Sequence, residues 1–193
     1  VIGLTGGIAS GKSTASAYLR ELGAAIVDAD AISRASTRRG GAAFEAVCAA
    51  FGDILGADGE IDRRKLGGIV FADEDARRKL NSIVHPAVMA ESRAQIENAR
   101  ASGVKVCILD VPLLFETGME KLCDETWLIY VPREEQIRRM AERDGLDAAA
   151  AAARIDSQMP LEEKLKRADV AIDSSGTIEQ TREKLRRLWE ERT

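Results

Sequence analysis

The sequence has few of the residues on which several classes of protein depend. It contains three cysteines and one histidine in 193 residues. Cys48, Cys107 and Cys123 are odd in number and far apart, so neither a disulfide framework nor a Cys-x-x-Cys zinc site is expected. The neighbours of His85, the only histidine, suggest no Ser-His-Asp or Cys-His arrangement. Catalysis by such groups is therefore not expected.

A strong charge and a long apolar run are also missing. The formal net charge is −4, whereas proteins that bind nucleic acids are usually strongly basic, so we expect no nucleic-acid partner. No apolar run approaches the roughly 18 residues of a membrane span, and no leader segment is visible. We therefore expect a cytoplasmic protein with no membrane partner. Hydrophobic residues at 45% and charged residues at 31% are ordinary for a globular protein.

What the sequence does contain, close to its start, is a phosphate-loop motif. The stretch GGIASGKST, residues 6–14, matches the pattern G-x-x-x-x-G-K-[ST]. The apolar segment VIGLT precedes it, and a predicted helix over residues 12–22 follows. Backbone N–H groups and the dipole at such a helix start favour an anion. The residues expected to hold the nucleotide are Gly6, Gly7, Ala9, Ser10, Gly11, Lys12, Ser13 and Thr14.

Phosphate and magnesium binding explain the residue types found in this loop. Glycine lets the chain bend tightly and lets phosphate oxygens approach where a Cβ would intrude. Lys12 would reach the β- and γ-phosphates of ATP, and the Ser13 hydroxyl would complete a magnesium shell. The alternative is a Gly-rich turn with a solvated lysine, which the flanking strand and helix disfavour.

The arrangement of apolar runs predicts a doubly wound α/β fold of the P-loop NTPase type, with a five-stranded parallel sheet. In the helix after the loop, Ala15, Leu19 and Leu22 form a core-facing stripe that ends before Gly23. The predicted strands are VIGLT, AAIVD, VKVCILD, TWLIYV and DVAID.

Two long intervals between the strands predict helical insertions into this single domain. The nucleotide-binding core is expected over 1–30, 100–131 and 167–193, with a helical lobe over 31–99 and a lid over 132–166. Within the lobe we predict helices over 40–52 and 73–100, joined through a turn in GADGEIDRRKL.

The lid segment carries a row of hydrogen-bond donors. Gln136, Arg139 and Arg143 are spaced i, i+3, i+7 and share one helix face. Donors on a mobile segment opposite a phosphate loop suit a lid that clamps phosphoryl oxygens. A solvated helical hairpin is the alternative, because positive and negative charges balance there.

Residues after the second predicted strand indicate which reaction the loop serves. No N-K-x-D element is present, which argues against a GTPase. Asp28 and Asp30 in VDADAISR follow a strand end, where open α/β sheets bind their ligands. Asp30 could orient an attacking hydroxyl and take its proton late in the transfer. Alternatively, either carboxylate caps the following helix.

A series of motifs runs in order from residue 2 to the C-terminal helix. They are GLTGGIASGKST, VDADAISR, FGDILGADGEIDRRKL, HPAV, DVPLLFETG, QIRRMAERDGL, RIDSQ with Lys164, and RADVAID. The phosphate loop is generic, but the DAD, HP and PLLFE elements in this order are specific. Together they resemble the dephospho-CoA kinase family. The resemblance implies ATP-dependent phosphorylation of the ribose 3′-hydroxyl of dephospho-CoA, with Mg²⁺, as the final step of coenzyme A synthesis.

The resemblance also implies roles for individual residues. Asp30 corresponds to the catalytic aspartate and Arg143 to a lid arginine on the phosphates, with Lys12 keeping its loop role and Arg139 beside it on the nucleotide. Asp110 has the position of a Walker-B-like acid that reaches magnesium through water. For His85, substrate contact and simple capping before Pro86 both stay open. The residues implied to border the acceptor pocket are Arg34, His85, Pro112 and Glu116.

One departure from the family pattern concerns the adenine. Relatives usually have an asparagine where this chain has Ser174, so backbone contacts are expected to carry more of the adenine selectivity.

Two alternative functions stay open. The protein could be another small-metabolite kinase, or an interaction protein that binds ATP without an acceptor. No apolar surface stripe is evident in the sequence, so a monomer is expected.

Overall fold

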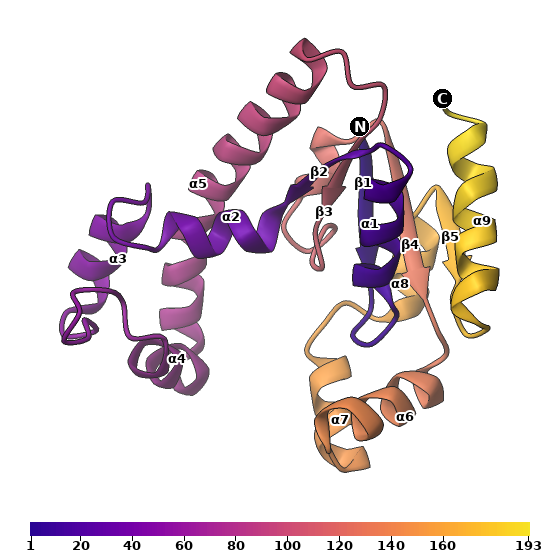
Figure 1. Cartoon of the computed structure of the whole chain (residues 1–193). Coiled ribbons are helices and arrows are strands. Elements are labelled where there is room, and N and C mark those ends of the chain that lie inside the picture. Colours follow the sequence, from indigo (N-terminus) through magenta and orange to yellow (C-terminus); the bar gives the residue numbers. More distant parts are fainter. The chain divides into compact units, whose positions relative to one another are not determined.

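The computed structural model describes all 193 residues, which form two compact units. Unit 1 comprises Val1–Val27 and Ile96–Thr193, and unit 2 comprises Asp28–Gln95. Each unit is described separately below, with the elements labelled as in Figure 1.

Unit 1 is built on a five-stranded sheet in the order β2-β3-β1-β4-β5. Strand β1 pairs in parallel with both β3 and β4, and β4 pairs in parallel with β5. This confirms the α/β fold with a parallel sheet that was predicted from the sequence. The prediction was possible because parallel strands that are buried on both faces have near-continuous apolar sequences. The strand bounds are β1 Ile2–Gly6, β2 Ala25–Asp28, β3 Cys107–Asp110, β4 Glu125–Tyr130 and β5 Val170–Asp173.

Helices α1 (Lys12–Glu21) and α9 (Ile178–Glu190) cover one face of this sheet. The predicted stripe on α1 is confirmed, with Ala15 and Leu19 buried in the main core and Leu22 packed against it. Gly23 has a φ of 103°, which suits glycine at the end of a helix. The strand residues that share this core are Ile2, Leu4, Ile108, Trp127, Ile129 and Ile172.

The other face of the sheet receives the segment after β3, the 3₁₀ turn η1 (Met119–Leu122) and helix α8 (Leu161–Arg167). Because side chains alternate along a strand, Gly3 points away from the main core. A Cβ on Gly3 would lie 2.7 Å from Cys123 Sγ and 2.9 Å from a Leu114 methyl. Burial raises the pKa of the Cys123 thiol to about 12.

Helices α6 (Arg133–Asp144) and α7 (Ala148–Asp156) form a hairpin beyond the strand ends that carry the phosphate loop. Arg133 donates to both carboxylate oxygens of Asp156, at 2.6 and 2.9 Å, and this ion pair joins the two helices. No helix in the protein combines the length and the apolar character that crossing a bilayer requires.

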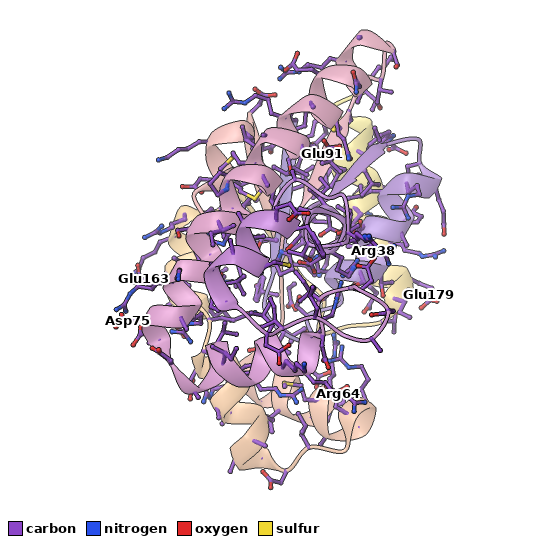
Figure 2. All side chains as sticks on the ribbon, turned by 90° about the vertical axis from the view of Figure 1, so that its left-hand side faces the viewer. Arg38, Arg64, Asp75, Glu91, Glu163 and Glu179 are labelled. Atoms are coloured by element: carbon purple, nitrogen blue, oxygen red, sulfur yellow. The ribbon has the colours of Figure 1, made fainter.

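Unit 2 is helical and comprises α2 (Ala29–Ser36), α3 (Phe44–Phe51), α4 (Arg63–Ala72) and most of α5 (Glu74–Ala101). Helices matching α3 and α5 were predicted. Helix α4 was not: the turn was predicted within residues 56–66, but the Asp62 side chain accepts from Arg64 N and caps a helix that begins at Arg63. Figure 2 shows Asp75 and Glu91 at different heights along α5.

Candidate active site

The phosphate loop connects β1 to α1, as the sequence predicts. A Cβ on Gly6 would lie 2.7 Å from the Ile129 carbonyl oxygen, and one on Gly7 would lie 2.6 Å from Gln136 Nε2. Ala9 and Gly11 have φ values of 60° and 85°, so the backbone turns through left-handed conformations here. The loop is therefore closely packed against β4 and α6 at its first two glycines, where a side chain would not fit.

The start of α1 is left open for an anion. Gly11 is its N-cap residue and provides no side-chain hydrogen bond to the first turn, whose N–H groups lack helical partners. The Ser10 hydroxyl is buried and has no hydrogen-bond partner. The hydroxyl lies close to where a Cβ on Gly6 would be, which is a further reason for glycine at that position. These features fit a nucleotide polyphosphate.

Lys12 and Asp110 form an ion pair beside the loop, with both side chains largely buried. Asp110 ends β3 and lies opposite Leu4 of β1, which explains why a residue far along the chain reaches this lysine. The pair places a cation and a carboxylate where the phosphates would lie.

Ser13, in the first turn of α1, is exposed at the loop's mouth. No group of three or more His, Cys, Asp or Glu side chains could hold a metal ion. A magnesium ion here would therefore take most of its ligands from phosphates and water, which suits an ion that keeps its water. The Ser13 hydroxyl and Asp110 are the side chains whose chemistry fits it.

Helix α6 presents two of its three predicted donors to the loop. Gln136 Nε2 donates to the Ile8 carbonyl oxygen at 2.8 Å. Arg139 donates to the carbonyl oxygens of Ala9 at 3.3 Å and Ser174 at 2.8 Å. The predicted row of donors thus joins α6 to the phosphate loop and to the segment after β5.

The third predicted donor, Arg143, does not contact the loop. Its guanidinium donates to Asp144 through Nε and Nη2, both at 2.8 Å, and its side chain is 63% exposed. Since Asp144 lies at the end of α6, this pairing leaves Arg143 tethered only to its own helix. Its assigned contact with phosphates stays a prediction.

Ser174 takes a place in this site that the sequence did not suggest. Its hydroxyl donates to the Ser10 carbonyl oxygen at 2.5 Å, with the Tyr130 carbonyl oxygen also within reach at 3.1 Å. The side chain is buried and ties the segment after β5 to the phosphate loop. The expectation that adenine selectivity relies on backbone here is untested, but the hydroxyl itself is engaged with protein carbonyls.

Pro112 and Glu116 lie on the segment after β3, and both contact Lys164. Lys164 Nζ lies 2.9 Å from Glu116 Oε1 and donates to the Pro112 carbonyl oxygen at 3.4 Å. The sequence analysis placed Lys164 among the motif residues that carry the family resemblance but gave it no role, and a lysine in a charged helix is normally solvated. Only its contacts in the folded protein reveal the cluster.

A cavity of about 510 Å³ opens next to this cluster. Its walls come from the phosphate loop, the end of β4, the start of α6 and the segment from the end of α7 into α8. Gly7, Gln136, Met159 and Lys164 are among the residues that line it.

In unit 2, helix α2 carries three of the predicted residues. Asp28 is its N-cap and accepts from Ala31 N at 2.9 Å, so the capping interpretation is confirmed for Asp28. Asp30 is exposed in the first turn, and Arg34 follows four residues later, so both lie on one helix face.

His85 lies on α5, well inside the helix, which continues through Pro86. The capping interpretation for His85 is therefore wrong, since no helix ends or begins there. Desolvation lowers the pKa of its imidazole from the usual value, so the ring is neutral at pH 7. Its contact with substrate stays a prediction.

Comparisons with known proteins agree on one family. The family model described as dephospho-CoA kinase matches residues 1–180. A dephospho-CoA kinase from Carboxydothermus hydrogenoformans is 54% identical over 96% of this chain and 90% of that protein. One from Geobacillus kaustophilus is 52% identical over 95% of this chain and 92% of that protein.

A solved structure supports the same assignment. The dephospho-CoA kinase from Campylobacter jejuni matches with a TM-score of 0.76 and 31% identity, covering 98% of this chain and 95% of that one. Fold, motifs and sequence identity thus agree along the whole length. The chain belongs to the dephospho-CoA kinase family of phosphotransferases.

Proposed function

We propose that this protein transfers the terminal phosphoryl group of ATP to the ribose 3′-hydroxyl of dephospho-CoA, which gives coenzyme A and ADP. The observation that carries the proposal is a phosphate loop with a Lys12–Asp110 pair in a chain that the family model matches from residue 1 to 180. As the final step of coenzyme A synthesis, this reaction uses a small-molecule acceptor.

On the donor side, the bare backbone of the loop and the start of α1 hold the phosphates of ATP. Lys12 leaves Asp110 to contact the β- and γ-phosphates, because a phosphate bears more negative charge than one carboxylate. Arg139 and Arg143 act from α6, the first beside the loop and the second after the lid moves.

Magnesium would supply positive charge that offsets the charge developing on the phosphates during transfer. Ser13 and Asp110, the latter through water, are the side chains that would hold it. The ion pair with Lys12 holds the Asp110 carboxylate in place until the nucleotide arrives.

On the acceptor side, Asp30 accepts a hydrogen bond from the 3′-hydroxyl and orients it. The hydroxyl oxygen forms a bond to the γ-phosphorus, the bond to the β-phosphate oxygen breaks, and Asp30 takes the proton late in the step. Arg34, His85, Pro112 and Glu116 border the acceptor.

Two segments serve these steps. The helical residues 31–99 bind dephospho-CoA, and residues 132–166, which include the α6–α7 hairpin, close over the phosphates. The separate compactness of Asp28–Gln95 supports the first assignment. We further propose a monomer located in the cytoplasm.

The experiment is ADP release with ATP, Mg²⁺ and a panel of acceptors. We expect dephospho-CoA to stimulate ADP release strongly, with coenzyme A formed in equal amount. Stimulation by a different small alcohol would instead indicate another metabolite kinase. Slow hydrolysis that no acceptor changes would indicate an ATP-binding interaction protein, and either result would overturn the proposal.

A further inference from the structure

Lys164 is a charged residue in a place that normally excludes charge. Its side chain is 1% exposed, and it is among the largest fully buried side chains of the protein. Removing an ammonium group from water costs several kcal/mol unless partners compensate. A methionine of similar length would fill the space without that cost. Filling space therefore does not account for a lysine at this position, and its polar contacts indicate what it does.

Those contacts connect three separate segments. Pro112, whose carbonyl oxygen lies 3.4 Å from Lys164 Nζ, also accepts from the Thr5 hydroxyl at 3.0 Å. Thr5 directly precedes Gly6 of the phosphate loop. Glu116, which pairs with Lys164 at 2.9 Å, also accepts from Met159 N at 3.1 Å. Met159 lies between α7 and α8, where the chain returns from the hairpin.

The cluster lies beside the phosphate loop. Lys164 and Met159 line the same cavity as Gly7 of the loop and Gln136 of α6. Asp110, the carboxylate that pairs with Lys12, is two residues before Pro112. A shift of the Pro112–Glu116 segment would therefore also displace groups close to the phosphates and at the base of the α6–α7 hairpin.

We propose that Lys164 is a positioning residue for phosphoryl transfer. It holds the Glu116 carboxylate and the Pro112 carbonyl in place, and through them fixes the segment after β3 against the returning end of the hairpin. The inference rests on the proposed function, in which Pro112 and Glu116 border the acceptor. Lys164 acts through Glu116 and does not itself touch the reacting atoms.

Replacement of Lys164 tests this role. In Lys164→Met, Glu116 loses its cation and keeps only the hydrogen bond from Met159 N, whereas the first turn of α1 is untouched. We expect kcat/KM for dephospho-CoA to fall at least about tenfold, while the Kd for ATP changes less than about twofold. The measurements are steady-state kinetics with dephospho-CoA and a direct titration with ATP.

Lys166→Met is the matched control. Lys166 lies on the same helix and pairs with Glu163, labelled in Figure 2, at 2.8 Å, but the Lys166 and Glu163 side chains are 69% and 48% exposed. An exposed ion pair contributes little, so we expect kinetic constants close to those of the wild type. Both substitutions remove one positive charge, but only Lys164 is buried. A difference between the two variants therefore reports the loss of the buried contacts and not the loss of charge.

Glu116→Gln keeps the proposal testable where Lys164→Met fails to fold, because it preserves the shape of the side chain. We expect the same selective loss in kcat/KM for dephospho-CoA. Since the two residues act as a unit, the double variant should be little worse than either single variant.

Two results would overturn the inference. One is a Lys164→Met protein with a lowered melting temperature but wild-type kcat/KM in its folded fraction, which means a purely structural pair. The other is an unimpaired Glu116→Gln protein beside an impaired Lys164→Met protein, which means that Lys164 does not act through Glu116. A wild-type protein inactive on dephospho-CoA would instead refute the proposed function.

Discussion

At the scale of single residues, two carboxylates near the start of α2 have different surroundings. Asp28 is occupied as the N-cap and accepts from Ala31 N. Asp30 is exposed within the first turn, where a carboxylate is also favoured by the helix dipole. The cap gives Asp28 a local structural role, and we assign the chemistry to Asp30 because the family resemblance places the catalytic aspartate there.

Asp30→Asn tests that assignment. The amide can still accept a hydrogen bond but cannot take a proton at neutral pH, so we expect turnover to fall by about 10²-fold or more. The fold and ATP binding should be preserved, because the substitution is isosteric. Turnover with dephospho-CoA, thermal unfolding and an ATP titration measure these three properties.

Asp28→Asn is the control for this prediction. Asparagine is as good an N-cap residue as aspartate, so stability and turnover should both stay close to those of the wild type. If Asp28→Asn removed activity and Asp30→Asn did not, the roles assigned to the two acids would have to be exchanged.

Single residues also show where prediction from sequence stops. Lys12, Ser13 and the loop glycines could be placed because the motif itself prescribes a local backbone geometry. The Ser174 bond to Ser10 and the burial of Lys164 could not, since each depends on chain segments brought together by the sheet. Local sequence carries no signal for such partners.

At the scale of elements, α6 carries arginines with unlike surroundings. Arg138 is 56% exposed and pairs only with Glu135 and Glu142 on its own helix. Arg139 is 25% exposed and reaches two backbone carbonyls outside the helix. Bonds from Arg138 and Arg139 hold the pKa of Glu135 at about 2, so this carboxylate is ionised at any working pH.

Arg139→Ala should therefore weaken ATP binding, and Arg138→Ala should not. Loss of the Arg139 guanidinium frees the Ala9 and Ser174 carbonyls beside the loop, and we expect the KM for ATP to rise by about tenfold, as for one lost charged hydrogen bond. Arg138→Ala removes only exposed pairs. Equal effects of the two substitutions on KM would contradict the roles described here.

Arg143→Ala extends the same comparison along α6. Because Arg143 pairs only with Asp144 at an exposed site, its removal should change the melting temperature little. If it contacts phosphates after the lid closes, kcat should still fall strongly. Parallel losses of kcat and melting temperature would favour a structural role.

The strands could be predicted because parallel strands buried on both faces are recognisable as short apolar runs. Helix α4 could not: its Gly67 and Gly68 are poor helix formers, and its start depends on the Asp62 cap. Helix α5 was predicted despite Pro86, which the long flanking helical stretches tolerate.

At the scale of the whole molecule, carboxylates with lowered pKa values are distributed along the chain. Hydrogen bonds from the Thr126 hydroxyl and N–H lower the pKa of Asp169, which lies just before β5. The Arg192 guanidinium, which donates to the Glu125 carboxylate, lowers the pKa of Glu125. Each of these groups favours the folded state while it is ionised.

Acid should therefore destabilise the protein. A carboxyl whose pKa is lower when folded stabilises the fold above its usual pKa near 4, and this stabilisation is lost as pH falls through the folded value. We expect a urea midpoint that is constant from pH 7 to 8, decreases slightly near pH 6.5 as His85 takes up a proton in the unfolded chain, and falls further below about pH 4. The measurement is urea unfolding as a function of pH.

Thr126→Val serves as the control for one of these groups. Without the hydroxyl, the pKa of Asp169 moves toward its usual value, so the variant should lose less stability than the wild type between neutral pH and pH 3. An unchanged pH profile would mean that the Thr126 hydroxyl does not contribute to the acid response.

The strand order of the sheet also governs the order of events during synthesis. Neither β1 nor β2 has a hydrogen-bonded neighbour until β3, Cys107–Asp110, has been made, and β1 gains its second neighbour only with β4. The phosphate loop therefore leaves the ribosome long before the sheet that shapes it can form, whereas Asp28–Gln95 is already complete. Pairing across such sequence separations is slow, so nucleotide binding should be among the last properties that a newly made chain acquires.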